Sequence, residues 1–320
     1  MLQALVGSAR RLFEDLTRSW QPERLVVPER PEPLQAGPRT YQPLQRVVLT
    51  DGVSRTLFEE FTAHRESSRG EEETGWVLLG VRETESALVL ATLPAGTERN
   101  AGVGHVQFDS RGQVLGCRIV RQADRRLTML GVVHTHPGSL RHPSDGDYRG
   151  DRTWVGQLRG GEGVFAIGTA DGAAGNGTLV ARQPRPSVQT LGKLCLSWYA
   201  LGKGDRGYRP LSVDLTLGPD LARPLHGVWP ALEANAQQID RLLSQQAGVT
   251  FEVHAGKCSP ALALNLPLVE PECSLRVLLE GKQVEYYLCR GGELLAADPQ
   301  ESRIDRGVYL LLAELAAQPD

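Results

Sequence analysis

Two histidines separated by one residue, His134 and His136, are the residues best placed to do chemistry in this sequence. They follow an apolar run that predicts a β-strand over 127–133, and successive side chains of a strand point to opposite faces. Residues two apart therefore point to the same side, so both imidazoles can approach one metal ion at about 2.0–2.1 Å. A carboxylate from the following loop would complete a three-ligand site whose fourth position is left for water, as in catalytic zinc centres.

The loop after the histidines contains Ser144, Asp145, Gly146 and Asp147, and it has two interpretations. Asp147 is the candidate third ligand. A Ser-x-x-Asp sequence is also typical of a helix N-terminal capping box, with Ser144 as the N-cap. The two interpretations are compatible, because a capped helix start would hold Asp147 in a fixed place.

These residues, in this order, resemble the motif of the JAMM (MPN+/JAB) metalloprotease domains. The motif continues upstream with a glutamate, and segment 73–80 (ETGWVLLG) is similar to the E-x-G-G-x-L-x-G segment of prokaryotic members. Trp76 stands where those members have their second glycine. The resemblance extends over residues 45–185 and implies an α/β fold, a cytidine-deaminase-like mixed sheet flanked by helices.

The resemblance also implies a role for each position of the motif. His134, His136 and Asp147 correspond to the ligands of one Zn²⁺ ion that carries a water molecule. Glu73 corresponds to the general base that takes a proton from this water and returns it to the departing amine. Ser144 corresponds to the hydroxyl that stabilises the tetrahedral oxyanion.

Other carboxylates and imidazoles lie close to the motif. The family spacing selects Glu73 over its two acidic neighbours. Asp145 and Asp151 could replace Asp147 as a ligand, but Asp145 lies too early in the turn and Asp151 lies one helical turn later. We expect His142, between two prolines, to face solvent or substrate. His105 is not expected to bind metal, and the set His254, Cys258, Cys273 and Cys289 matches no zinc spacing, so core packing is the better interpretation.

Composition excludes several classes of protein. The 320 residues carry 35 basic and 38 acidic side chains, a net charge of −3 that gives no electrostatic attraction to nucleic acid or an anionic membrane. The five cysteines are scattered and form no CxxC pair, which argues against a disulfide scaffold or a zinc ribbon. No apolar run approaches the roughly 20 residues that span a bilayer, so we expect a cytoplasmic protein.

The sequence predicts four segments. An amphipathic helix over 1–20 and a proline-rich linker over 21–44 precede a catalytic α/β domain over 45–190, and an α+β accessory domain occupies 195–320. In the catalytic domain, apolar patterns predict strands at 46–49, 76–81, 87–93, 127–133, 163–169 and 179–182 and helices at 54–64, 114–123 and 147–158. In the accessory domain they predict strands at 211–217, 249–254, 261–267, 275–279 and 284–289 and helices at 229–246 and 303–317.

The resemblance predicts a zinc-dependent isopeptidase or peptidase that cleaves after the C-terminal tail of a ubiquitin-like protein. It would either remove that protein from a conjugate or mature its precursor, and the resemblance associates such enzymes with E1- and E2-like partners in bacterial ubiquitination-like pathways. Two alternatives stay open: a non-catalytic MPN-type scaffold, and a peptidase that processes small sulfur-carrier proteins.

Overall fold

The computed structural model describes residues 40–96, 101–102, 105–106, 111–171, 181–256, 259–268, 270 and 272–317. The predicted helix at 1–20 and nearly all of the predicted linker at 21–44 lie outside these residues. The chain divides into two compact units with the boundary between His226 and Gly227. We call them the N-terminal and C-terminal units. Among the described residues, no helix combines the length and apolar character that a membrane span requires.

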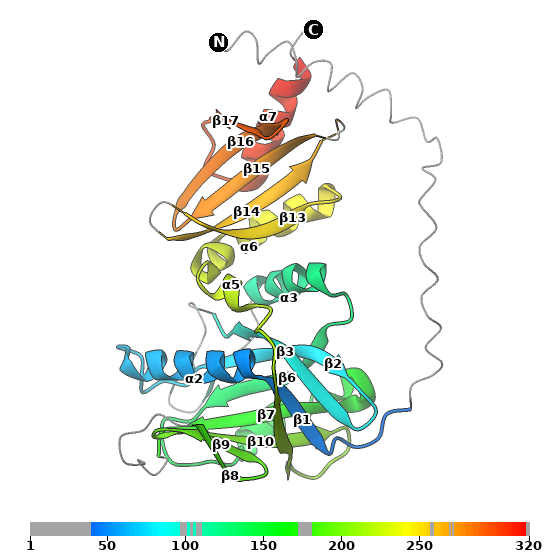
Figure 1. Cartoon of the computed structure of the whole chain (residues 1–320), viewed down its shortest axis with the longest axis vertical. Helices are drawn as coiled ribbons and strands as arrows, with labels where there is room; N and C mark the ends of the chain where they lie inside the picture. The colour runs from blue at the N-terminus through cyan, green and yellow to red at the C-terminus, as the bar shows by residue number, and fades with distance from the viewer. Residues whose placement is uncertain are drawn as a thin grey trace. The chain divides into compact units, whose positions relative to one another are not determined.

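The N-terminal unit is built on a ten-stranded mixed sheet in the order β12-β1-β3-β2-β6-β7-β10-β9-β8, with β11 paired to β10 (Figure 1). Its strands are β1 (Arg46–Thr50), β2 (Gly75–Arg82), β3 (Ser86–Pro94), β6 (Thr128–Thr135), β7 (Glu162–Thr169), β8 (Ala181–Arg185), β9 (Val188–Leu191), β10 (Leu194–Gly202), β11 (Arg209–Pro210) and β12 (Ser212–Thr216). Its helices are α2 (Asp51–Glu66), α3 (Arg111–Ala123), α4 (Asp145–Asp151) and α5 (Arg223–His226), and β4 (Ala101–Gly102) and β5 (His105–Val106) form a separate pair.

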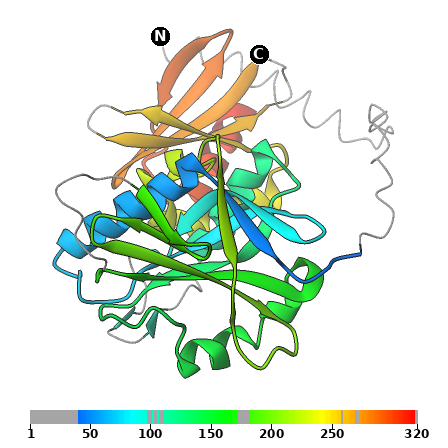
Figure 2. The same ribbon diagram turned by 60° about the horizontal axis from the view of Figure 1, so that its bottom comes forward.

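The sheet combines parallel and antiparallel pairs and curls around α2. Strand β1 runs parallel to β3 and β12, and β6 runs parallel to β7, whereas β2 is antiparallel to both of its neighbours. Figure 2 shows the curved strands with α2 lying along them. The Val213 N–H of β12 donates to the Pro186 carbonyl in the β8–β9 turn at 2.8 Å, so the two ends of the sheet meet. The predicted mixed α/β sheet is confirmed.

Helix α2 forms the centre of the core. It begins after Thr50, whose side chain accepts a hydrogen bond from the Val53 N–H at 3.2 Å and caps the helix. Its apolar residues at helical spacing, Val53, Leu57 and Phe61, are at most 1% exposed. One buried cluster joins them to strands from both halves of the sheet, including Val47, Leu49, Val89, Val133, Ala166, Leu196, Trp198 and Val213. Burial of this shared face is what stabilises the helix.

The domain boundary lies later than the predicted 190–195. Strand β10 pairs with β7 and β9 and is buried along almost its whole length, and β12 pairs in parallel with β1. Both strands therefore belong to the first sheet, which continues along the chain beyond the predicted strand at 179–182. In space, β8 at Ala181–Arg185 lies at the edge of this sheet. The pattern of 211–217 does predict a strand, but a parallel partner more than 150 residues away leaves no trace in a local pattern.

The predicted helix at 147–158 is also corrected. The structure has the short helix α4 at Asp145–Asp151, followed by two single 3₁₀ turns at Val155–Gln157 and Arg159–Gly161. No residue of α4 is buried, and Gly146 and Gly150 lower its intrinsic helix stability. A helix without an apolar face depends on side-chain hydrogen bonds for its position.

The C-terminal unit is an antiparallel five-stranded sheet in sequential order with two helices. It contains α6 (Trp229–Gln245), β13 (Thr250–Ala255), β14 (Pro260–Pro267), β15 (Cys273–Glu280), β16 (Gln283–Arg290), β17 (Glu293–Ala297) and α7 (Ile304–Ala317). Alternate residues of β15 are buried, which is the pattern of a sheet covered on one face. The predicted α+β class is confirmed. Strand β17, an exposed edge strand, was not predicted.

Candidate metal centre

The two histidines lie at the end of β6. His134 is paired with Ile167 in the parallel strand β7, and the His136 N–H donates to the Gly168 carbonyl at 2.8 Å, which continues the pairing. Gly131, three residues before His134, lets β6 approach β7, because a Cβ there would lie 1.7 Å from the Val164 carbonyl oxygen. Both imidazoles are buried, at 6% and 7% exposure. Their predicted placement on one side of the strand end is confirmed.

Asp147 reaches the histidines from α4. Ser144 is the N-cap of this helix: its Oγ accepts from the Asp147 N–H at 3.2 Å, while the Ser144 N–H donates to Asp147 Oδ2 at 2.6 Å. The predicted capping box is therefore present, and it fixes the carboxylate of Asp147. Accepting through Oγ leaves the Ser144 hydroxyl proton available for donation to another group.

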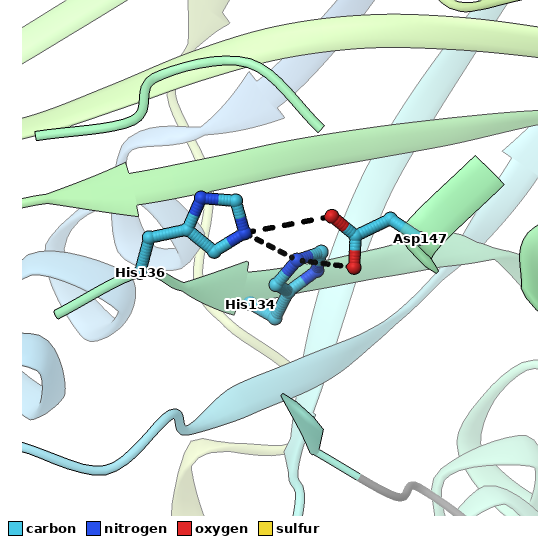
Figure 3. Close-up of side chains that lie close together, drawn as sticks. All are labelled: His134, His136 and Asp147. Atoms are coloured by element: carbon cyan, nitrogen blue, oxygen red, sulfur yellow. Dashed lines mark hydrogen bonds and ion pairs between the residues drawn. The ribbon is translucent and has the colours of Figure 1, made fainter. Parts of the chain in front are cut away.

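Three side chains converge at this point (Figure 3). His134 Nε2 lies 3.2 Å from Asp147 Oδ1, His136 Nε2 lies 3.5 Å from Asp147 Oδ2, and the two Nε2 atoms are 3.2 Å apart. His136 Nδ1 lies 2.7 Å from the Leu140 carbonyl, to which it donates, so Nε2 is the ring nitrogen that faces Asp147 and could bind a metal ion. Two imidazole nitrogens and one carboxylate are a donor set typical of zinc, and three protein ligands are typical of a catalytic site.

The electrostatics of the cluster favour a cation. Although burial opposes it, hydrogen bonding to Asp147 and the Leu140 carbonyl, together with the charges of Asp147 and Glu73, raises the pKa of His136. Burial also opposes ionisation of Asp147, but hydrogen bonds from both imidazoles hold the pKa of that carboxyl far below its usual range. Asp147 is therefore a carboxylate, which can act as a negatively charged ligand.

Backbone pairing brings Glu73 to the same place. Gly75 of β2 is paired with His134, and the Thr135 N–H donates to the Thr74 carbonyl at 2.9 Å. Continuing this antiparallel register by one residue sets Glu73 opposite His136. Glu73 is 4% exposed, and its backbone N–H donates to the Gly102 carbonyl of β4 at 2.9 Å. The electrostatic effect of Glu73 on His136 is consistent with this position.

The competing carboxylates lie elsewhere. The Glu71 side chain is 82% exposed and lies 3.3 Å from Arg65, and Glu72 forms an ion pair with Arg69 at 2.6 Å. Asp145 is exposed.

Asp151 is half-buried and accepts from the Tyr208 hydroxyl at 2.6 Å and from Trp154 Nε1 at 3.2 Å. Burial raises the pKa of Asp151 to about 6. This carboxyl is therefore held by two donors of its own.

The other candidate ligands do not join the cluster. His142 is exposed and its Nδ1 lies 2.9 Å from the Tyr199 hydroxyl. His254 pairs with Glu252 at 2.9 Å. Cys258 and the side chain of His105 lie outside the described residues, within which His134, His136 and Asp147 are the single group of this kind.

Trp76 explains the departure from the glycine-rich segment. Its side chain is 2% exposed, and its Nε1 donates to Glu60 Oε2 on α2 at 2.7 Å. The indole therefore points from β2 towards α2 and is held there by Glu60.

Two tyrosines near the centre were missed from the sequence. Tyr199 donates to the Arg141 carbonyl at 2.7 Å, and Tyr208 donates to Asp151. The predicted boundary assigned both to the other domain, and no motif marks a tyrosine that hydrogen-bonds a loop.

Comparison with known proteins identifies the domain that holds these residues. Residues 54–181 match the family model described as prokaryotic homologs of the JAB domain. Among solved structures, the chain is similar to the solution structure of protein DSY2949 from Desulfitobacterium hafniense, with 18% identity, coverage of 54% of this chain and 95% of that chain, and a TM-score of 0.35. No curated protein matches the chain.

Proposed function

Because residues 54–181 form a JAB-family domain, a family with both peptidases and non-catalytic members, we propose that this protein is a zinc-dependent isopeptidase or peptidase. Its substrate is the C-terminal tail of a ubiquitin-like protein, either in a conjugate or in a precursor. The convergence of His134, His136 and Asp147 on one point supports this proposal most strongly, since a scaffold has no need of a complete set of ligands.

Each polar group of the centre has a task in amide hydrolysis. His134, His136 and Asp147 would hold the ion, which supplies Lewis acidity by polarising the amide carbonyl and lowering the pKa of water towards about 7. Glu73 takes a proton from the attacking water and delivers it to the departing amine. The Ser144 hydroxyl donates to the negative oxygen that develops on the carbonyl, and its N-cap position holds it beside Asp147.

The substrate class comes from the family resemblance, and two physical points support it. An extended tail can add as a strand beside an exposed strand edge, where backbone hydrogen bonds give affinity. Terminal glycines let such a tail pass close to a buried centre where larger side chains would collide. E1- and E2-like partners and a cytoplasmic location belong to the same proposal, as do the alternative substrates, small sulfur-carrier proteins.

A comparison of two neighbouring glutamates tests the proposal. Glu73→Gln should keep zinc but reduce cleavage of ubiquitin-like fusions with a C-terminal extension by about 10²–10⁴-fold, because it removes the base. Glu72→Gln, the matched control, alters a partly exposed residue paired with Arg69 and should leave cleavage unchanged. Equal cleavage by wild type and Glu73→Gln would contradict the assigned base. Zinc-loaded wild type that cleaves no fusion would favour the scaffold.

A further inference from the structure

The hairpin formed by β10, β11 and the turn between them, residues 194–210, contacts the segments that carry the candidate metal ligands. We call it the tyrosine hairpin. It lies outside the 54–181 segment that matches the JAB family. Three hydrogen bonds join it to the segment that follows β6: Tyr199 hydroxyl to Arg141 carbonyl at 2.7 Å, Tyr148 hydroxyl to Asp205 carbonyl at 2.8 Å, and Tyr208 hydroxyl to Asp151 at 2.6 Å.

Two of these contacts hold α4, because Tyr148 and Asp151 both belong to this helix. The helix has no buried residue, so packing alone does not fix its position. Asp151 follows Asp147 by four residues and therefore lies on the same side of the helix, one turn further along. Its carboxylate accepts from Tyr208 and from Trp154, whereas the capping box holds the other end of the helix. The direction in which α4 presents Asp147 thus depends on the Asp151–Tyr208 contact together with the Tyr148–Asp205 hydrogen bond.

The third contact, from Tyr199 to Arg141, holds the loop between His136 and Ser144. The Leu140 carbonyl accepts from His136 Nδ1 and sets the orientation of that imidazole. The next carbonyl, of Arg141, accepts from the Tyr199 hydroxyl, and His142 Nδ1 also lies within hydrogen-bond distance of that hydroxyl. Tyr199 is buried, so its side chain is held in place and its hydroxyl positions the loop through this hydrogen bond.

The two tyrosines belong to one aromatic group. The Tyr208 ring packs edge-on against Phe165 with centroids 5.4 Å apart, and it lies 6.3 Å from the rings of Tyr148 and Tyr199. Phe165 is on β7, the strand beside the histidines. The group therefore links the tyrosine hairpin to the strand that supports the centre, and removing one hydroxyl leaves this packing in place.

We propose that Tyr199 and Tyr208 are positioning residues of the metal centre: Tyr208 orients Asp147 through Asp151 and α4, and Tyr199 orients His136 through the loop. This inference rests on the proposed function insofar as the centre binds a divalent metal. Groups that orient metal ligands from outside typically contribute 10–100-fold to metal affinity. The tyrosine hairpin thus supports the metal centre from outside the segment that matches the JAB family.

Binding of Co²⁺ to the full chain tests this inference, because its visible spectrum reports ligand geometry. Tyr208→Phe and Tyr199→Phe should each weaken Co²⁺ binding by roughly 10–100-fold in competition with a chelator and should alter the spectrum. Tyr287→Phe is the matched control, since the Tyr287 hydroxyl makes a 2.6 Å hydrogen bond to the Glu285 carboxylate in the C-terminal unit. It should bind Co²⁺ as wild type does.

A second pair of variants separates positioning from folding. Asp151→Asn can keep both contacts, with its amide oxygen accepting from Trp154 and its amide N–H donating to the Tyr208 hydroxyl, and should bind Co²⁺ nearly as wild type. Asp151→Ala should resemble Tyr208→Phe. The metal-free melting temperature of each variant shows whether it folds. If Tyr208→Phe, Tyr199→Phe and Asp151→Ala all keep the wild-type Co²⁺ affinity and spectrum, this inference is overturned and the proposed function is not affected. Absence of Co²⁺ binding by wild type would overturn the proposed function, and this inference with it.

Discussion

Ser144 and Asp147 exchange two hydrogen bonds, in which each backbone N–H donates to the side chain of the other residue, at 3.2 and 2.6 Å. The same carboxylate faces His134 and His136. One pair of residues therefore begins a helix and completes a set of metal ligands. Because the cap fixes Asp147 before any ion binds, the centre is preorganised by the start of the helix that follows it.

Replacing Ser144 should separate its two tasks. Ser144→Ala removes the cap acceptor, which costs about 1 kcal/mol of stability, and removes the oxyanion donor, which reduces cleavage by about 10²–10³-fold. Zinc content should stay at the wild-type level, because the three ligands remain. Ser144→Thr, which keeps a hydroxyl and a good cap, should retain stability. Wild-type cleavage rates in Ser144→Ala would exclude the oxyanion role.

His226 gives the N-terminal unit a pH-dependent contact. Its Nδ1 pairs with Glu60 and its Nε2 lies 2.6 Å from the Thr92 carbonyl. Both partners are acceptors, so both ring nitrogens donate and the ring is an imidazolium. Burial opposes this charge, but the hydrogen bond and charge of Glu60, the Thr92 carbonyl and the charge of Asp220 together raise the pKa of His226.

Because the pKa of His226 is raised in the folded state, this contact contributes its full stability below the unfolded-state pKa of about 6.5. That contribution is lost as the pH rises through the folded-state pKa. We therefore expect the melting temperature of metal-free protein to fall above about pH 6.5. The dependence should be weaker in His226→Gln. His254→Gln, which alters a side chain 43% exposed in the other unit, should retain the wild-type profile. If His226→Gln keeps the wild-type dependence of melting temperature on pH, the assignment of this dependence to His226 is contradicted.

Glu162 carries a buried charge network. It accepts from Arg82 at 3.4 Å, from the Leu44 N–H at 2.6 Å and from Arg209. The Arg82 side chain is 1% exposed, so Glu162→Gln would leave its charge buried without a counter-ion, and we expect a loss of about 3–5 kcal/mol in urea unfolding. Asp214→Asn breaks an exposed pair with Arg46 and should cost about 0–1 kcal/mol. Similar losses for both would contradict this ranking.

Truncation tests the domain boundary. A fragment of residues 40–226 should fold cooperatively and bind zinc, because it contains every strand of the ten-stranded sheet. A fragment of residues 40–190 lacks β10, the strand between β7 and β9, and should not fold. Thermal unfolding and the dispersion of NMR chemical shifts show whether each fragment folds. Cooperative unfolding of the shorter fragment would show that β10 is dispensable.

The candidate site could be predicted from the sequence where its geometry is local. His134 and His136 are two residues apart, so both point to the same side of a strand, whose side chains alternate. Ser144 and Asp147 have the spacing of the N-cap and N3 positions of a helix, which a capping box joins. Glu73 is different, because the β2–β6 register that brings it to His136 joins residues about 60 apart. Only the family resemblance pointed to it.

The fold was predictable to a similar extent. Apolar patterns predicted most of the individual strands and helices, because burial on one face leaves a periodic trace, and the family resemblance implied the mixed sheet. The pairing of β12 with β1 and the contact of Tyr208 with Asp151 depend on the whole fold, since they join segments about 165 and 57 residues apart. No local period encodes them, so the domain boundary and the positioning tyrosines emerged only from the structure.

The measurement that tests the central claim most directly is the metal content of the purified chain and of two histidine variants. We predict one zinc ion per chain in wild type, the same in His142→Ala, whose side chain is exposed, and none in His136→Ala. Wild type without stoichiometric metal, or His136→Ala with the full amount, would contradict the metal centre described by His134, His136 and Asp147.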